Sequence, residues 1–232
     1  MWPFRRHILL KDSGIFDGFI DWHSHILPGV DDGVQTMGEA LEILRLYEEL
    51  GVKSVWLTPH IMEDRPNTTA YLRERFAELQ AAYKGSVTVH LAAENMLDNL
   101  FEERLEKNDL LPLGETGDHL LVETSYFNPP MGLESILRRI KAKGYHPVLA
   151  HPERYAYMEK KDYQQLKNMG VKFQLNLPSL MGVYGRIPKT KAEWLAKNHI
   201  YHLFGTDIHR ASQFMSIATR KILNNKIMNH IR

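Results

Sequence analysis

Seven short apolar, strand-like segments alternate with helical segments along this chain, and this alternation limits its possible folds more than any other feature. The first strand-like segment begins near residue 18, and the others span residues 53–58, 87–93, 119–125, 147–150, 172–176 and 200–206. Apolar residues recur at helical spacing over residues 35–50, 69–83, 133–143, 161–169 and 189–197. Strands that alternate with helices form right-handed β-α units around a parallel sheet. We therefore predict an α/β fold, as a closed or nearly closed barrel of seven units.

The chain has the length and composition of a single domain, which we expect to span residues 1–232. Its 44% apolar and 25% charged residues are ordinary for a globular protein. No linker-like or repeated segment interrupts the pattern. We expect residues 1–17 to form an N-terminal arm, residues 211–232 a helical tail, and residues 96–117 a charged, helical excursion.

Charge and cysteine content exclude several classes of function. The 29 basic and 28 acidic residues nearly balance, so no nucleic-acid partner is indicated. There is no apolar run of about 18 residues to span a membrane and no good signal peptide, which favours a cytoplasmic location. The absence of cysteine excludes disulfides and a cysteine nucleophile.

Residues 21–25 (DWHSH) follow the first strand-like segment and contain the first candidate metal ligands. Alternate residues of a strand face the same side, so His23 and His25 can bind one ion. Later strand-like segments also end in imidazole or carboxylate side chains. The candidate ligands at these ends, with one on the loop after the first strand, are His23, His25, Asp32, His60, Glu94, Glu123, His151, Asp207 and His209.

The carboxyl ends of parallel barrel strands meet on one face, where active sites lie. Nine ligands exceed the needs of one tetrahedral ion and suit two or three divalent ions that share a bridging carboxylate. The pattern predicts a metal-dependent hydrolase with its metal site at the C-terminal rim of the strands.

Six segments resemble those of the polymerase-and-histidinol-phosphatase (PHP) superfamily: HSHILPGVDDG, LTPH, AAEN, LVETS, AHPERY and GTDIH. Within it, they resemble the bacterial protein-tyrosine phosphatases of capsular and exopolysaccharide biosynthesis. The resemblance runs from about Phe19 to His209. It implies a distorted (β/α)7 barrel with two or three metal ions, of which Mn is expected and Fe, Zn or Mg is possible.

The resemblance also implies a division of the nine ligands, none of which is missing here. His23, His25 and Asp207 would surround one ion, and Glu123 would bridge to a second ion. Glu94 and His151 would hold that second ion, while Asp32, His60 and His209 would hold the third. Asn95 departs from the family pattern, which has an aromatic residue after the motif glutamate.

The implied reaction is hydrolysis of phosphotyrosine on a protein by a metal-activated hydroxide. The expected substrate is the tyrosine-rich tail of a polysaccharide-synthesis kinase. Arg154 is the best candidate to bind phosphate bidentately, and Arg210 is a weaker one. Asp31 is a candidate partner for a ligating histidine or a helix cap.

Two other functions remain open from the sequence. One is a phosphomonoesterase for a small metabolite, such as histidinol phosphate. The other is a non-enzymatic metal-binding module associated with a membrane synthesis complex, with the basic N-terminus as docking arm. An open rim would favour a protein substrate, whereas a pocket closed by residues 96–117 would favour a metabolite. The sequence does not specify the oligomeric state.

Overall fold

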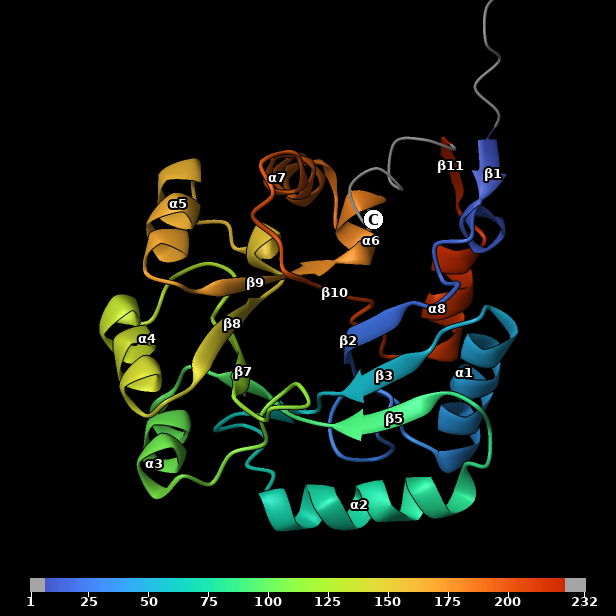
Figure 1. Cartoon of the computed structure of the whole chain (residues 1–232), viewed down its shortest axis with the longest axis horizontal. Helices are drawn as coiled ribbons and strands as arrows, with labels where there is room; N and C mark the ends of the chain where they lie inside the picture. The colour runs from blue at the N-terminus through green and yellow to red at the C-terminus, as the bar shows by residue number, and fades with distance from the viewer. Residues whose placement is uncertain (1–6, 224–232) are drawn as a thin grey trace, which may run out of the picture.

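Two parallel sheets organise residues 7–223, which are the residues that this computed structural model describes (Figure 1). The smaller sheet has the strand order β2-β3-β5 and the larger one the order β10-β9-β8-β7-β6-β4. Their strands are β2 (Ile20–Ser24), β3 (Ser54–Leu57), β4 (His60–Ile61), β5 (Thr88–Leu91), β6 (Glu94–Met96), β7 (His119–Glu123), β8 (His146–Ala150), β9 (Lys172–Asn176) and β10 (Leu203–Gly205). The predicted α/β class with a parallel sheet is confirmed.

The two sheets are joined into one curled surface by strands that break and continue. The chain leaves β3 at Leu57, passes Thr58 and Pro59, and resumes as β4 in the larger sheet. The chain breaks again between β5 and β6. On the other side, Ser24 of β2 bridges Ile208, which follows β10. The result is a curled, half-barrel parallel sheet, and the complete closure of a seven-unit barrel stays a prediction.

Helices cover the outer side of this curled sheet (Figure 1). They are α1 (Met37–Glu49), α2 (Thr69–Ala82), α3 (Asn99–Lys107), α4 (Leu133–Ala142), α5 (Lys160–Asn168), α6 (Leu177–Leu180), α7 (Arg186–Lys197) and α8 (Ala211–Ala218). Helix α4 shows how they pack, because Ile136, Leu137 and Ile140 recur at helical spacing and are all buried. Among the described residues, no helix has both the length and the apolar character to cross a bilayer.

Both ends of the described chain differ from the predicted arm and tail. Strand β1 (His7–Leu9) pairs antiparallel with β11 (Lys221–Leu223), and Leu10 and Phe16 are buried in the core. The C-terminal segment is helical only to Ala218 and then turns into β11. Burial of apolar side chains thus fixes residues 7–17 to the domain. The rest of the predicted arm and tail, residues 1–6 and 224–232, lies outside the described residues.

The charged excursion at residues 96–117 contains α3, as the sequence predicts, and runs along the side of the sheet. Helix α3 lies beside α4, where Arg139 pairs with Glu102 at 3.1 Å. The segment then returns through buried Leu111 and Leu113, and Leu113 bridges His119 at the start of β7. The excursion therefore begins at the strand ends that carry the candidate ligands, where Leu97 N–H donates to the Glu123 carbonyl (2.9 Å), and finishes at the amino end of β7.

A buried carboxylate joins three parts of this fold. Asp21 in β2 accepts hydrogen bonds from the Tyr47 hydroxyl (2.6 Å) on α1 and from the Thr206 hydroxyl (2.6 Å) and backbone N–H (2.8 Å) after β10. The pKa of Asp21 is raised overall, because burial raises it more than the hydrogen bonds from Thr206 and Tyr47 lower it. These bonds fix the strand that carries His23 and His25 against its neighbours.

We expect Tyr47→Phe to lower the free energy of unfolding by about 1–3 kcal/mol, because Asp21 would lose a buried donor. Urea denaturation measures the effect. Tyr145→Phe is the matched control, since Tyr145 donates to Asn108 at the surface (2.8 Å) and its loss should cost less than about 0.5 kcal/mol. Equal losses in the two variants would show that the Asp21 contacts do not support the fold.

Candidate metal centre

The nine candidate ligands gather where the strands of the curled sheet end. His23 lies within β2, Glu123 ends β7, and His151 directly follows β8. His60 and Glu94 begin the short strands β4 and β6, which pair with each other at these two residues. Asp207 and His209 follow β10, and His25 follows β2. The predicted convergence of strand ends therefore brings together side chains that are far apart in sequence.

Eight of the nine form groups whose ligand atoms lie within 4.8 Å of one another. The four groups are His23–His25–Asp207, His23–Glu94–His151, His60–Glu94–Glu123 and His25–His60–His209. Asp32 stands at the edge, 3.6 Å from His60 Nε2 and 4.0 Å from His209 Nε2. Its carboxylate also lies 2.5 Å from Arg65 NH1, a contact that the sequence did not suggest.

Glu94 lies at the middle of this arrangement. It shares one group with His23 and His151 and another with His60 and Glu123. Its two carboxylate oxygens lie 3.1 Å from His23 Nε2 and 2.9 Å from His151 Nε2. The geometry thus gives Glu94 the central position, whereas the family resemblance implies Glu123 as the bridging carboxylate.

Hydrogen bonds at the Nδ1 atom orient three imidazoles of the cluster. Each joins an Nδ1 atom to an oxygen acceptor: His23 to Gln174 Oε1 (2.9 Å), His25 to Asp31 Oδ2 (2.8 Å) and His209 to the Asp207 carbonyl (2.9 Å). An Nδ1–H that donates outward leaves Nε2 with a lone pair, which is the state that binds a metal ion. The suggested role of Asp31 as partner of a ligating histidine agrees with this contact.

The cluster concentrates negative charge in a buried place. Burial raises the pKa of Glu94, but His23 and His60 lower it more, to well below its ordinary value. Burial lowers the pKa of His23, but Glu94 and Asp207 raise it more, to about 9. Buried carboxylates therefore draw positive charge into the site, whether as protons or as metal ions.

Two features fit the donor set to divalent cations. His60 Nδ1 and Glu123 Oε1 are buried and only 2.9 Å apart, yet neither makes a hydrogen bond of acceptable geometry with a described residue. Buried polar atoms are normally paired, so such atoms indicate a missing partner. Imidazole and carboxylate together suit Zn, Mn or Fe, and these residues therefore fit a metal site.

The backbone is strained at two of the candidate ligands. His151 (φ 31°) and Asp207 (φ 52°) adopt left-handed conformations, which residues other than glycine rarely occupy. Such conformations cost on the order of 1–3 kcal/mol and cluster at functional sites. The fold therefore positions these two side chains at a cost in local stability.

The cluster is reached from one side. The side chain of Asp32 is 49% exposed, that of His209 25% and that of Arg154 20%, whereas His23, His25 and Glu94 are buried completely. A substrate would therefore approach past Asp32, His209 and Arg154.

Arg154 lies at this entrance between two aromatic rings. Its guanidinium carbon is 4.4 Å from the ring centre of Tyr126 and 4.3 Å from that of Tyr184. One N–H donates to Asp207 Oδ2 at 2.7 Å, and four of the five guanidinium N–H donors remain to serve other acceptors. Burial lowers the pKa of Arg154, but Asp207 raises it more, so the group stays charged. The other arginine that the sequence suggested, Arg210, donates to the backbone carbonyls of residues 32, 33 and 209 and holds that loop.

Several residues near the site were not found from the sequence. Tyr126 and Tyr184 come from loops, where no periodicity marks them. Gln174 is a polar residue inside β9, a signal that could have been noticed. Asn95, the departure from the family pattern, is buried and donates to the carbonyls of residues 93 and 121, so it supports strand pairing and does not shape the rim.

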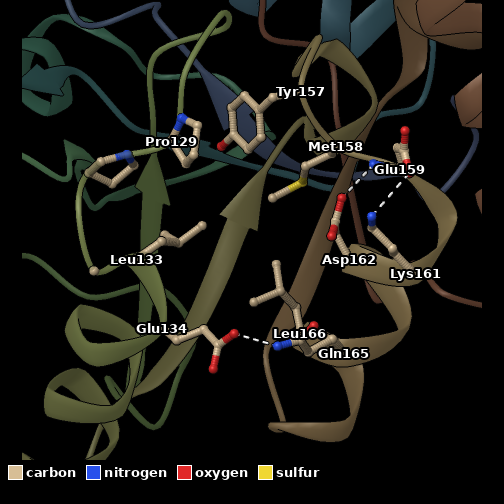
Figure 2. A pocket seen from close by; sticks show the side chains of 12 residues that line it. Pro129, Leu133, Glu134, Tyr157, Met158, Glu159, Lys161, Asp162, Gln165 and Leu166 are labelled. Atoms are coloured by element: carbon tan, nitrogen blue, oxygen red, sulfur yellow. Dashed lines mark hydrogen bonds and ion pairs between the residues drawn. The ribbon is translucent and has the colours of Figure 1, made fainter.

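A cavity of about 690 Å³ lies away from this cluster, between the loops that precede α4 and α5 (Figure 2). Pro129, Leu133, Tyr157 and Met158 form its apolar wall, and its charged rim comprises Glu134, Glu159, Lys161 and Asp162. None of the nine candidate ligands lines it, so the cavity is separate from the candidate metal centre.

Three curated relatives share most of this chain. Tyrosine-protein phosphatase YwqE of Bacillus subtilis is 29% identical over 201 residues, which cover 82% of this chain and 77% of that protein. Tyrosine-protein phosphatase CpsB of Streptococcus pneumoniae is 29% identical over 206 residues, 82% of each chain. The putative tyrosine-protein phosphatase CapC of Staphylococcus aureus is 25% identical over 216 residues, 90% of this chain and 82% of that protein.

The fold and the family agree with these similarities. A crystal structure described among those of YwqE from Bacillus subtilis and CpsB from Streptococcus pneumoniae, metal-dependent tyrosine phosphatases, matches with a TM-score of 0.78 at 26% identity. The match covers 92% of this chain and 86% of that one. The family described as capsular polysaccharide synthesis, CpsB/CapC, matches residues 19–223. The sequence resemblance is thereby confirmed, and this chain belongs to the CpsB/CapC family of capsular polysaccharide synthesis proteins.

Proposed function

We propose that this chain is a metal-dependent protein-tyrosine phosphatase with its site at the carboxyl ends of a (β/α)7 barrel. The observation that carries the proposal is the buried cluster of imidazoles and carboxylates beside the guanidinium of Arg154. The named relatives, which are tyrosine-protein phosphatases, support the same reaction. The proposed ligands are His23, His25, Asp32, His60, Glu94, Glu123, His151, Asp207 and His209.

The proposal extends to the biological setting. The substrate would be a phosphotyrosine protein, the tail of a tyrosine kinase in polysaccharide synthesis, and the enzyme would act in the cytoplasm as a single domain. Two or three divalent ions, with Mn expected, would occupy the site. Asp32 and Arg154 are partly exposed at the entrance, and an open rim favours a protein substrate over a small metabolite such as histidinol phosphate.

In this proposal, the residues around the site have different roles, which follow from their positions. Divalent ions, when bound, lower the pKa of water and neutralise charge on phosphoryl oxygens. Asp31 and Gln174 hold His25 and His23 in the tautomer that ligates. Arg154 presents a planar fork of N–H donors to phosphate oxygens and stabilises charge that develops on them. Phenolate leaves readily, so no strong general acid is required.

Turnover should depend on bound metal and not on a thiol. Chelation is expected to abolish hydrolysis of a phosphotyrosine peptide, and Mn or a similar ion should restore it, because the ligand set carries the chemistry. Thiol alkylation should have no effect, since the chain contains no cysteine. Elemental analysis checks the metal content, and full activity of metal-free protein would refute the proposed function.

Glu94→Gln should remove more metal than Glu123→Gln, because Glu94 belongs to two of the ligand groups and Glu123 to one. Each variant should lose at least one ion per chain and roughly 100-fold or more in turnover, since metal-ion catalysis is worth several kcal/mol. Glu102→Gln on α3, far from the cluster, is the matched control. If Glu123→Gln lost the more metal, Glu123 would be the bridging ligand that the resemblance implies.

Arg154→Ala should lower kcat/KM for a phosphotyrosine peptide by roughly 10- to 150-fold, the value of a charge-assisted hydrogen bond. Arg154→Lys should recover only part of the lost kcat/KM, because an ammonium group cannot form the bidentate hydrogen bonds of a guanidinium. Arg138→Ala on the exposed side of α4 is the control. Metal content and melting temperature should stay nearly unchanged; loss of metal would instead mean that Arg154 acts by holding Asp207.

A further inference from the structure

Exposed apolar side chains are concentrated on two loops beside the candidate site. Among the described residues, six large hydrophobic side chains are exposed; three of them lie on these loops and a fourth lies in the helical turn that follows the second loop. Phe127 (75% exposed) and Met131 (98%) belong to the loop between β7 and α4, Val183 (37%) to the segment that links α6 and α7, and Ile187 (68%) to the first turn of α7. We call these four residues the apolar collar. Single exposed apolar residues are ordinary, but a gathering of them marks an interaction surface.

The collar is continuous with the entrance to the metal centre. Tyr126 precedes Phe127 and Tyr184 follows Val183, and these two tyrosines are the ones whose rings enclose the Arg154 guanidinium. Consecutive Cα atoms lie about 3.8 Å apart. The apolar side chains therefore begin one residue away from the groups that contact Arg154, on both sides of it.

The chemistry of the two loops favours apolar contact. Residues 125–132 (SYFNPPMG) and 181–185 (MGVYG) contain no charged side chain, and the exposed Arg186 is the one charged residue between Val183 and Ile187. Pro129 and Pro130 restrict the first loop, so Phe127 and Met131 can be buried by a partner at a lower cost in conformational entropy. Backbone contacts also hold this loop, since Ala156 N–H donates to the Tyr126 carbonyl at 2.7 Å.

We infer that the apolar collar binds the residues that flank phosphotyrosine in the substrate polypeptide, and that it prefers apolar flanking side chains. This inference rests on the proposed function. A phosphotyrosine whose phosphate reaches Arg154 leaves its own backbone at the level of the loops, outside the buried ligands. In an extended peptide, neighbouring residues lie about 3.3 Å apart along the chain, within reach of the collar on either side. Burial of apolar surface would then add affinity for a protein substrate that a small phosphate ester cannot gain.

The test compares three substrates of the metal-loaded, full-length enzyme. Two are phosphotyrosine peptides that differ only in having leucine or serine on both sides of the phosphotyrosine, and the third is p-nitrophenyl phosphate. The unmodified enzyme should prefer the leucine peptide by roughly tenfold in kcat/KM. The double variant Phe127→Ser/Ile187→Ser should lose this preference, mainly through KM, and keep its turnover of p-nitrophenyl phosphate within about twofold.

Tyr71→Ser is the matched control, because Tyr71 is an exposed aromatic residue on α2, outside the two loops (40% exposed). It should retain the preference for leucine. Equal turnover of the two peptides by the unmodified enzyme would overturn the inference, as would an equal loss on all three substrates in the double variant, which would indicate a structural role. Failure of the unmodified enzyme to hydrolyse any of the three would refute the proposed function itself and the inference with it.

Discussion

The repulsion among buried carboxylates is the constraint on which the centre of this structure depends. Glu94, Glu123 and Asp207 lie among five imidazoles, almost without access to water. Such charges are costly to bury unless cations or hydrogen-bond donors compensate them. In the protein alone, the imidazoles supply this compensation, as the raised pKa of His23 indicates. The same groups could hold divalent cations, which would take the place of the protons.

The rest of the fold holds these groups in place against that repulsion. Gln174 and Asp31 fix two imidazoles from outside the cluster. Asp21 ties the strand that carries them to α1 and to Thr206. Gly205 permits the close approach of β10, because a Cβ at that position would lie 2.5 Å from the Cβ of His23. Backbone hydrogen bonds hold the left-handed conformation at Asp207, since Asp207 N–H donates to the His23 carbonyl (2.8 Å) and the Ile208 carbonyl accepts from His25 N–H (2.9 Å).

Much of the fold and the candidate site could be predicted because both depend on periodic patterns. Strands alternating with helices specify a parallel sheet, and the carboxyl ends of parallel strands meet at one edge. Candidate ligands at the ends of the strand-like segments were therefore expected together. The β1–β11 pair could not be predicted, since two short strands joined only by tertiary contacts leave no periodic signal. The same holds for Tyr126 and Tyr184, whose positions beside Arg154 depend on loop conformation.

By itself, the sequence determined the α/β class, the family and the set of candidate ligands, because each rests on residue types at regular places along the chain. Only the tertiary structure decided how those ligands group, with Glu94 between His23 and His60, and which arginine faces the entrance. It also decided that the excursion at residues 96–117 finishes at the start of β7 and that two collar residues, Phe127 and Val183, adjoin the tyrosines that enclose Arg154. Distances between side chains from different strands depend on sheet curvature and loop paths, which long-range packing sets and local sequence does not.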